Sequence, residues 1–292
     1  MNAIDQSTDE PFAQRLRSAV HPVDVLVLCA IPMVLLGVFT LSAARREALA
    51  FSYTDPTVLT AFTANFVHLD VGHLLANLGA YALVVPVVYL LSVLSGKRRR
   101  FWIVFTVFLV VFPVALSFLN LAIARPGAGI GFSGINMAFV GYLPIALAGY
   151  AAVRFDVGPE RDLAGALFFA GIALIAVLSV QSVLTYGLAV AALLAALLYW
   201  LSMLEHRGGA RFDVRAAVNA AGDFELAVAG IVLFAGLPLI AFPIDPALDA
   251  GTVNLYIHLL GYALGFIATY LTVLTMSRFA TDDADASVEL TV

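Results

Sequence analysis

The chain has 292 residues, of which 62 % are hydrophobic and 12 % are charged, with a formal net charge of −5. Soluble globular domains are about 45–50 % apolar and about 25 % charged, so this composition excludes an ordinary soluble enzyme, a disordered chain and a nucleic-acid binder. The mean hydropathy of +0.98 indicates an all-α polytopic membrane protein in a lipid bilayer.

Apolar runs of at least 18 residues are typical of transmembrane helices. The sequence contains eight such runs, at residues 24–42, 73–94, 101–123, 133–153, 163–181, 184–204, 226–243 and 254–277. They predict a cytoplasmic segment over 1–22, a transmembrane domain over 23–278 and an acidic, disordered tail over 279–292. The first 20 residues are polar and charged without a cleavable-signal pattern, so the first apolar run is expected to act as an uncleaved anchor.

The fifth and sixth runs are nearly continuous. As one helix, residues 163–204 would be about 63 Å long, twice the thickness of a hydrocarbon core. We therefore expect a turn near Gln181 and Ser182. Prolines within the other runs predict kinks, at Pro86, Pro113, Pro144 and Pro238.

Positive charge orients the spans. With a cytoplasmic N-terminus, eight spans place twelve Lys and Arg residues inside and only Arg45, Arg46 and Arg125 outside, as the positive-inside rule requires. The run Lys97–Arg100 is interpreted as a cytoplasmic topology anchor. The first outer loop, about 42–72, is semi-polar and is expected to lie in the membrane interface.

The first polar group within a span is His73 with Asn77. The two residues are four positions apart on a helix and therefore share a face, while His68 lies where the outer loop meets the span. Such a pair can supply convergent hydrogen-bond donors. Alternatively, it can join neighbouring helices by hydrogen bonds.

The second group is Gly131-Phe132-Ser133-Gly134, where the fourth span begins. A serine there is often a helix cap, and glycine and serine also pack helices together. In the chemical interpretation, a serine at a helix N-terminus has free backbone N–H groups that stabilise an oxyanion.

The third group is His258 followed by Gly261 and Gly265 on the same helix face. The glycines allow a neighbouring helix to approach closely. A lone histidine near a helix end can also be an interfacial residue, and this alternative stays open.

Topology connects the three groups. The second, fourth and eighth spans all run from outside to inside, so His73, Ser133 and His258 lie at one depth on the outer side. A serine, an imidazole base and further donors are the minimal set for acyl transfer: Ser133 attacks and His258 accepts its proton. His73, Asn77 and the Ser133 N–H then hold the oxyanion.

These patterns resemble the rhomboid family of intramembrane serine proteases. The matching residues are His68, His73 and Asn77; Gly131, Ser133 and Gly134; and His258, Gly261 and Gly265. The resemblance implies a six-span core, a Ser133–His258 dyad, an oxyanion hole at His73 and Asn77, and supporting roles for His68 and the glycines. It also implies single-span membrane proteins as substrates and neither metal nor cofactor.

The chain departs from the family pattern in three ways. Three spans instead of one separate Ser133 from His258, so two of them are extra, and the sequence does not say which two. Met137 stands where many members have a tyrosine. The first loop lacks the family's Trp-Arg pair, for which Arg45 and Arg46 are possible substitutes.

Two other functions fit parts of the pattern. A catalytically inactive rhomboid-like protein would bind membrane clients, although such proteins usually lose the serine or histidine. A small-solute or proton transporter could use the same polar residues, but it would be expected to have inverted repeats. The natural substrate and the oligomeric state are left open.

Overall fold

The structure is a computed structural model that describes residues 10–123, 127–179, 182–206, 214–242 and 254–289. Arg125 and Gln181 lie outside these ranges. The described elements, in chain order, are α1 (Phe12–Ala19), α2 (Pro22–Phe39), α3 (Ala43–Ala48), β1 (Phe51–Ser52), α4 (Val58–Thr63), η1 (Ala64–Phe66), α5 (Val71–Leu94), α6 (Arg98–Val110), α7 (Phe112–Leu119), η2 (Asn120–Ala122), β2 (Ala128–Gly129), α8 (Ser133–Phe155), α9 (Glu160–Leu178), α10 (Val183–His206), α11 (Val214–Asn219), α12 (Asp223–Ala241) and α13 (Leu255–Glu289).

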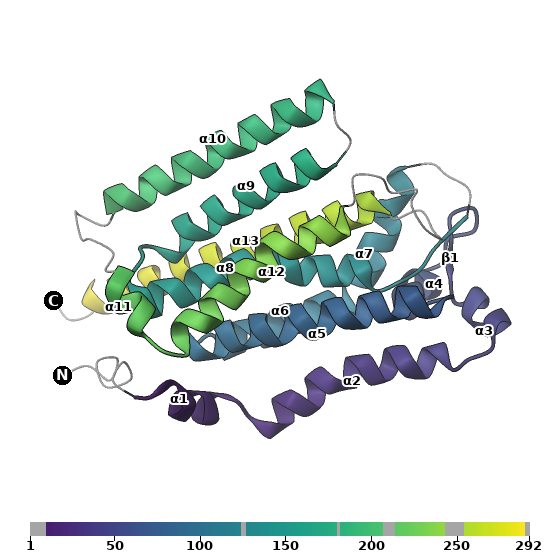
Figure 1. The fold of residues 1–292 in the computed structure, drawn as a ribbon, viewed down its shortest axis with the longest axis horizontal. Helices are drawn as coiled ribbons and strands as arrows, with labels where there is room; N and C mark the ends of the chain where they lie inside the picture. Colours follow the sequence, from purple (N-terminus) through teal and green to yellow (C-terminus); the bar gives the residue numbers. More distant parts are fainter. Residues whose placement is uncertain (1–9, 124–126, 180–181, 207–213, 243–253, 290–292) are drawn as a thin grey trace.

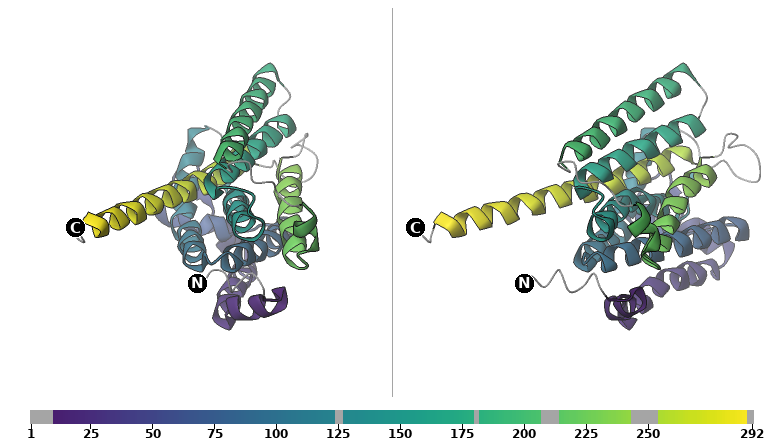
Figure 2. Two further views of the ribbon diagram at one scale, coloured as in Figure 1. Left: turned by 90° about the vertical axis from the view of Figure 1, so that its left-hand side faces the viewer. Right: turned by 60° about the vertical axis from the view of Figure 1, so that its left-hand side comes forward.

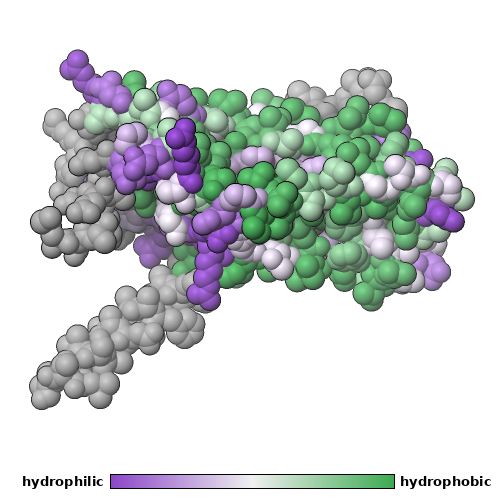
Figure 3. All heavy atoms as spheres, turned by 90° about the horizontal axis from the view of Figure 1, so that it is seen from below, coloured by the Kyte–Doolittle hydropathy of each residue, from purple (hydrophilic) through white to green (hydrophobic). Residues whose placement is uncertain are grey.

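The predicted all-α polytopic bundle is confirmed (Figure 1). Seven of the described helices are long and apolar enough to cross a membrane, and α6 with α7 forms an eighth span if this bent pair counts as one. Hydrophobic surface covers the middle of the molecule, with hydrophilic residues toward its two ends (Figure 3). This distribution is that of a multi-pass membrane protein.

Two of the expected interruptions appear where the sequence places them. The α6–α7 pair bends by 49° beside Pro113, which stands in the first turn of α7 and cannot continue the hydrogen bonding of α6. Helix α9 ends at Leu178 and α10 begins at Val183. The run 163–204 is therefore two helices.

Helix α8 is the centre of the bundle, and glycines let α13 lie directly on it. A Cβ atom added at Gly261 would collide with the backbone oxygen of Gly134, and one at Gly265 would collide with that of Ala138. In the other direction, a Cβ at Gly141 would collide with the backbone oxygen of Tyr262. The two backbones are therefore in contact along several turns, as small residues permit.

Helices α9 and α10 form a hairpin along one side of the bundle (Figures 1 and 2). Helix α10 packs mainly on α9 and exposes large apolar side chains such as Val183 and Leu184. Helix α12 instead packs on α8, α5 and α9. Helix α9 also packs directly on α8, so the hairpin and α12 both lie against the core.

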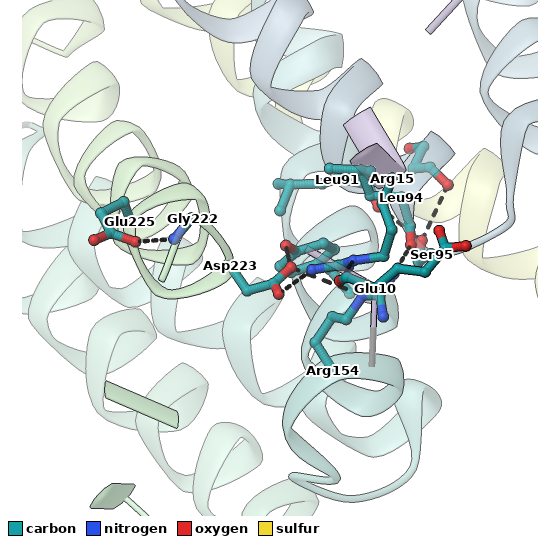
Figure 4. A network of polar contacts seen from close by, with 11 residues as sticks. Glu10, Arg15, Leu91, Leu94, Ser95, Arg154, Gly222, Asp223 and Glu225 are labelled. Atoms are coloured by element: carbon teal, nitrogen blue, oxygen red, sulfur yellow. Dashed lines mark hydrogen bonds and ion pairs between the residues drawn. The ribbon is translucent and has the colours of Figure 1, made fainter. Parts of the chain in front are cut away.

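Ion pairs gather at one end of the bundle, called the basic end here. Arg98 pairs with Asp24 at the start of α2, and Lys97 and Arg100 both pair with Glu160 at the start of α9. At the same end Arg15 of α1 and Arg154 of α8 meet Asp223 at the start of α12, and the Tyr150 hydroxyl donates to this carboxylate (Figure 4).

The opposite end, called the site end, is formed by the segment between α2 and α5 and the loop before α8. Strands β1 and β2 pair there in antiparallel register, with Phe51 opposite Gly129. The Asn65 side chain donates to the carbonyls of Ala61 and Pro113. The strand pairing holds the loop that leads into α8, and the Asn65 bonds tie the segment before α5 to α4 and α7.

Helix α13 is longer than its predicted span. It continues to Glu289, through most of the segment 279–292 for which the sequence predicts a disordered tail. Residues 281–289 contain no glycine or proline to end a helix. This extension projects away from the bundle (Figure 2).

Candidate active site

The first turns of α5 carry the predicted oxyanion donors. The Asp70 carboxylate caps this helix by accepting the His73 N–H at 2.7 Å. One turn later, the side-chain amide of Asn77 donates to the His73 carbonyl at 3.0 Å and is buried. His73 and Asn77 therefore lie on one face of α5, as the i, i+4 spacing predicts.

Gly131 packs directly against the His73 ring. A Cβ atom at Gly131 would lie 2.5 Å from His73 Cε1 and 2.7 Å from Nε2, and the residue has φ +102°. Its N–H donates to the Ala64 carbonyl at 2.9 Å. Glycine is required here both for the left-handed backbone and for the space that the imidazole occupies.

Ser133 begins α8 and is not its cap. Phe132 is the N-cap residue and makes no side-chain cap bond. Ser133 is half-buried, and its hydroxyl makes no hydrogen bond with another described residue. As the first helical residue it presents a backbone N–H that has no partner within the helix. The structure therefore excludes the capping interpretation of this serine.

The contact between α8 and α13 joins the first turns of the two helices that carry Ser133 and His258. A Cβ at Gly134 would lie 3.0 Å from Ile257 Cγ1 and 3.8 Å from the Ile257 carbonyl oxygen. Ser133 precedes Gly134 and His258 follows Ile257, so the two side chains belong to adjacent turns of touching helices. No hydrogen bond joins them among the described contacts, which is common in catalytic pairs without substrate.

His258 is 8 % exposed and has neighbours at the end of α12 and on α5. Its Nδ1 lies 2.8 Å from the Ala241 carbonyl oxygen at the end of α12. The Phe242 ring meets it edge to face, with centroids 6.0 Å apart. His73 of α5 is close enough to interact with it electrostatically. The three predicted groups thus converge at the site end.

His68 packs behind the site. Its ring contacts that of His73 at a centroid distance of 4.9 Å, and it is fully buried. Neither ring nitrogen makes a hydrogen bond of good geometry with a described residue. Arg46 holds the turn around it by donating to the His68 carbonyl at 2.6 Å while stacking on Phe39. Of the two arginines suggested for the missing Trp-Arg pair, Arg46 contacts the site.

Burial and the neighbouring His73 lower the pKa of His68 from 6.5 to about 4. The unfolded chain then binds a proton at pH values where the folded protein does not, so stability falls as the pH drops from about 6.5 to about 4. We expect this residue to account for a loss of about 3 kcal/mol over that window. His68→Phe keeps the ring shape and should remove this part of the pH dependence.

Equilibrium unfolding of both proteins in bilayer discs, measured at several pH values, tests this expectation. At pH 7.5 the two should be similarly stable, because the neutral ring makes no good hydrogen bond. Parallel pH curves for the wild type and His68→Phe would contradict the assignment.

Gly131→Ala is expected to displace His73 as well as strain the backbone. Gly127 offers a matched control, because it also has a positive φ (+109°) but a Cβ there would meet nothing within 4 Å. Both substitutions should cost about 1–2 kcal/mol of backbone strain. Only Gly131→Ala should in addition lower any hydrolytic activity of the site, by about 10²-fold.

Equal activities of the two alanine variants would show that the His73 position does not depend on Gly131. Activity is compared at matched amounts of folded protein, so that the shared backbone strain cancels.

The sequence interpretation missed two site residues. Asn136 of α8 donates its amide to the Asn77 carbonyl at 3.0 Å and to Asn77 Oδ1 at 3.2 Å, which orients the predicted oxyanion donor. It is a polar residue inside a span, so the rule that selected Asn77 could have found it. Phe242 gave no such signal, because an aromatic residue at a span end is ordinary.

Met137 lies beside the α13 glycines. Its Cβ is 3.1 Å from the Cβ position of Gly261, one turn after His258. The aromatic contact with His258 comes from Phe242, which directly follows α12, and not from position 137.

Among the described residues, no three His, Cys, Asp or Glu side chains are placed to hold a metal ion. Comparison of the chain with protein-family models, with curated proteins and with solved structures found no match. A function for this chain is therefore inferred from the site itself and from the motif resemblance.

Proposed function

We propose that this chain is an intramembrane serine protease of the rhomboid type. The observation that supports the proposal is the Gly134–Gly261 contact, because Ser133 precedes Gly134 and His258 lies one turn before Gly261. Ser133 is half-buried and its hydroxyl makes no hydrogen bond with another described residue, and His258 is buried. Helix α5 carries two further donors, His73 and Asn77, and the His73 ring packs against Gly131, two residues before Ser133. A nucleophile, a base and oxyanion donors on three rigid helices are the parts that acyl transfer needs.

In the proposed reaction, Ser133 Oγ attacks a peptide carbonyl while His258 accepts the hydroxyl proton. The Ser133 N–H, the His73 ring and the Asn77 amide stabilise the oxyanion. The imidazolium then protonates the leaving amine, which leaves an acyl-serine. Water, activated by the same imidazole, hydrolyses this ester and restores the hydroxyl.

The helix packing suggests which spans are additional to a six-span core. Helix α12 packs on both α5 and α8, whereas α10 packs mainly on α9. We assign α12 as the span between the serine and histidine helices, and the α9–α10 hairpin as the extra pair. Because they form a hairpin, the extra spans leave the direction of α13 unchanged.

The proposed orientation follows from charge. The basic end is cytoplasmic by the positive-inside rule, which puts the site end toward the outer face. Single-span membrane proteins are the proposed substrates, cut in or near their transmembrane segments where the helix is locally unstable.

The test uses the full chain in liposomes with a tagged single-span protein and, separately, a fluorophosphonate probe. The wild type should cleave the substrate and carry the probe on Ser133, as located by mass spectrometry. Ser133→Ala should do neither. Ser179→Ala is the matched control, because Ser179 directly follows α9 at the same side of the bundle as the site, and among the described residues its hydroxyl donates only to the Ile175 carbonyl of that helix. Cleavage by Ser133→Ala would overturn the nucleophile assignment, and a wild type that neither cleaves nor reacts would overturn the proposed activity.

A further inference from the structure

The hydrogen bond between His258 and Ala241 determines which imidazole nitrogen is the base. The two atoms, Nδ1 and the carbonyl oxygen, are 2.8 Å apart. A carbonyl oxygen can only accept, so Nδ1 must carry the proton. In the neutral ring Nε2 is then unprotonated, with its lone pair free to accept the serine proton.

The Ala241 carbonyl is available because α12 stops there. Ala241 is the last residue of the helix, and the last four carbonyls of any helix have no partner within it. Phe242 leaves helical geometry at φ −123°, ψ 66°. The next residue in the sequence is Pro243, which disfavours a helical conformation for the residue before it.

The end of α12 also places negative partial charge beside the ring. Aligned peptide dipoles leave about half a negative charge at a helix C-terminus, which favours a cation in the last turn. The Phe242 ring, 1 % exposed, closes the same side of His258. Of the other elements packed here, α8 presents Gly134 and Met137 to α13, and α5 presents the titratable His73.

We infer that the Ala241 carbonyl positions the base, in the role that a carboxylate plays in a Ser-His-Asp triad. It holds His258 as the Nδ1–H tautomer with Nε2 directed to the nucleophile, and with the α12 terminus it stabilises the imidazolium that forms during attack. Within the described part of the chain no carboxylate hydrogen-bonds to His258. This inference rests on the proposed function, since it names the group that orients its base.

The tautomer can be measured without any activity. Protein labelled with ¹⁵N-histidine is placed in bilayer discs, and the His258 resonances are assigned by their loss in His258→Gln. At pH 7.5 we expect a protonated-type shift at Nδ1 and an unprotonated-type shift at Nε2. The opposite pattern, with the proton on Nε2, would overturn the inference.

A backbone variant tests the carbonyl itself. Replacing Phe242 by phenyllactic acid turns the Ala241 carbonyl into a weaker ester acceptor and keeps the Phe242 ring. It also removes the Phe242 N–H bond to the Pro238 carbonyl. The same replacement at Phe234, within α12, removes an equivalent helical N–H and leaves the Ala241 carbonyl intact.

With the ester at Phe242 we expect about a tenfold loss of kcat/KM and of the rate of fluorophosphonate labelling, together with a weaker Nδ1–H preference. The ester at Phe234 should change both rates by less than about twofold. Equal effects of the two esters, or an unchanged tautomer at Phe242, would overturn the inference. If the wild type proves inactive, the proposed function fails, and the tautomer measurement alone decides the role of the carbonyl.

Discussion

Ser133→Ala and His258→Ala are each expected to lower kcat/KM for a transmembrane substrate by about 10⁴-fold or more, and the double variant is expected to lose no further activity. Residues that act as one unit in catalysis are strongly non-additive, because removing either leaves nothing for the other to do. A hydroxyl without its base is a weak nucleophile, and an imidazole without the hydroxyl has no proton to accept.

The helix packing is the reason to expect that the two residues act as one unit. The two side chains come from helices whose backbones touch at Gly134 and Gly261, so neither can move away without separating α8 from α13. Independent roles, such as a proton path through His258 and a packing role for Ser133, would instead give losses that add in free energy.

The measurement is cleavage in liposomes by the four proteins of the cycle, with the amount of folded protein matched by an unfolding assay. His21→Ala controls for the loss of a histidine, because His21 is exposed, at the far end of α2 from the site. Additive losses would contradict a shared step, and activity retained by His258→Ala would remove the histidine from the proposed mechanism.

Much of the fold was predictable because the bilayer restricts the solutions. Seven of the eight apolar runs each became one helix, and the run 101–123 became the bent pair α6–α7. The bend lies at Pro113, one of the prolines for which a kink is predicted. The helix α1 was not predicted. Its Arg15 pairs with Asp223, 208 residues away, and no local pattern reveals such a partner.

Part of the candidate site could also be predicted from the sequence, and part of it could not. His73, Ser133 and His258 were selected from their own side chains, because polar groups within spans are costly and therefore informative. The contact of Gly131 with His73 gives the glycine motif a physical cause. The Ala241 carbonyl has no signature, because every residue has a carbonyl and only the end of α12 frees this one.

Asp223→Ala is expected to lower the free energy of unfolding by about 3–5 kcal/mol, the usual cost of leaving buried charges without their partner. The Asp223 carboxylate accepts from Arg15 and from the Tyr150 hydroxyl, and Arg154 Nε lies 3.8 Å from it (Figure 4). The side chains of Arg15, Arg154 and Asp223 are only 8 %, 9 % and 10 % exposed. Two guanidinium groups therefore lose their shared counter-ion in a site that water reaches poorly.

Glu225→Ala is the matched control, because it removes a negative charge from the same turn of α12. Glu225 is exposed and accepts the Gly222 N–H at 2.6 Å, so its loss should cost about 1 kcal/mol.

Asp223→Asn tests the effect of the charge apart from that of the side-chain shape. It keeps the side-chain volume and one acceptor for the Tyr150 hydroxyl, yet it leaves both arginines without a negative partner. If Asp223→Asn lowers the free energy of unfolding about as much as Asp223→Ala, the stabilisation comes from the charge of the carboxylate. Hydrogen exchange in α1 should then be faster in both variants, because Arg15 ties α1 to α12 through Asp223. A cost for Asp223→Ala no larger than that for Glu225→Ala would contradict the buried network.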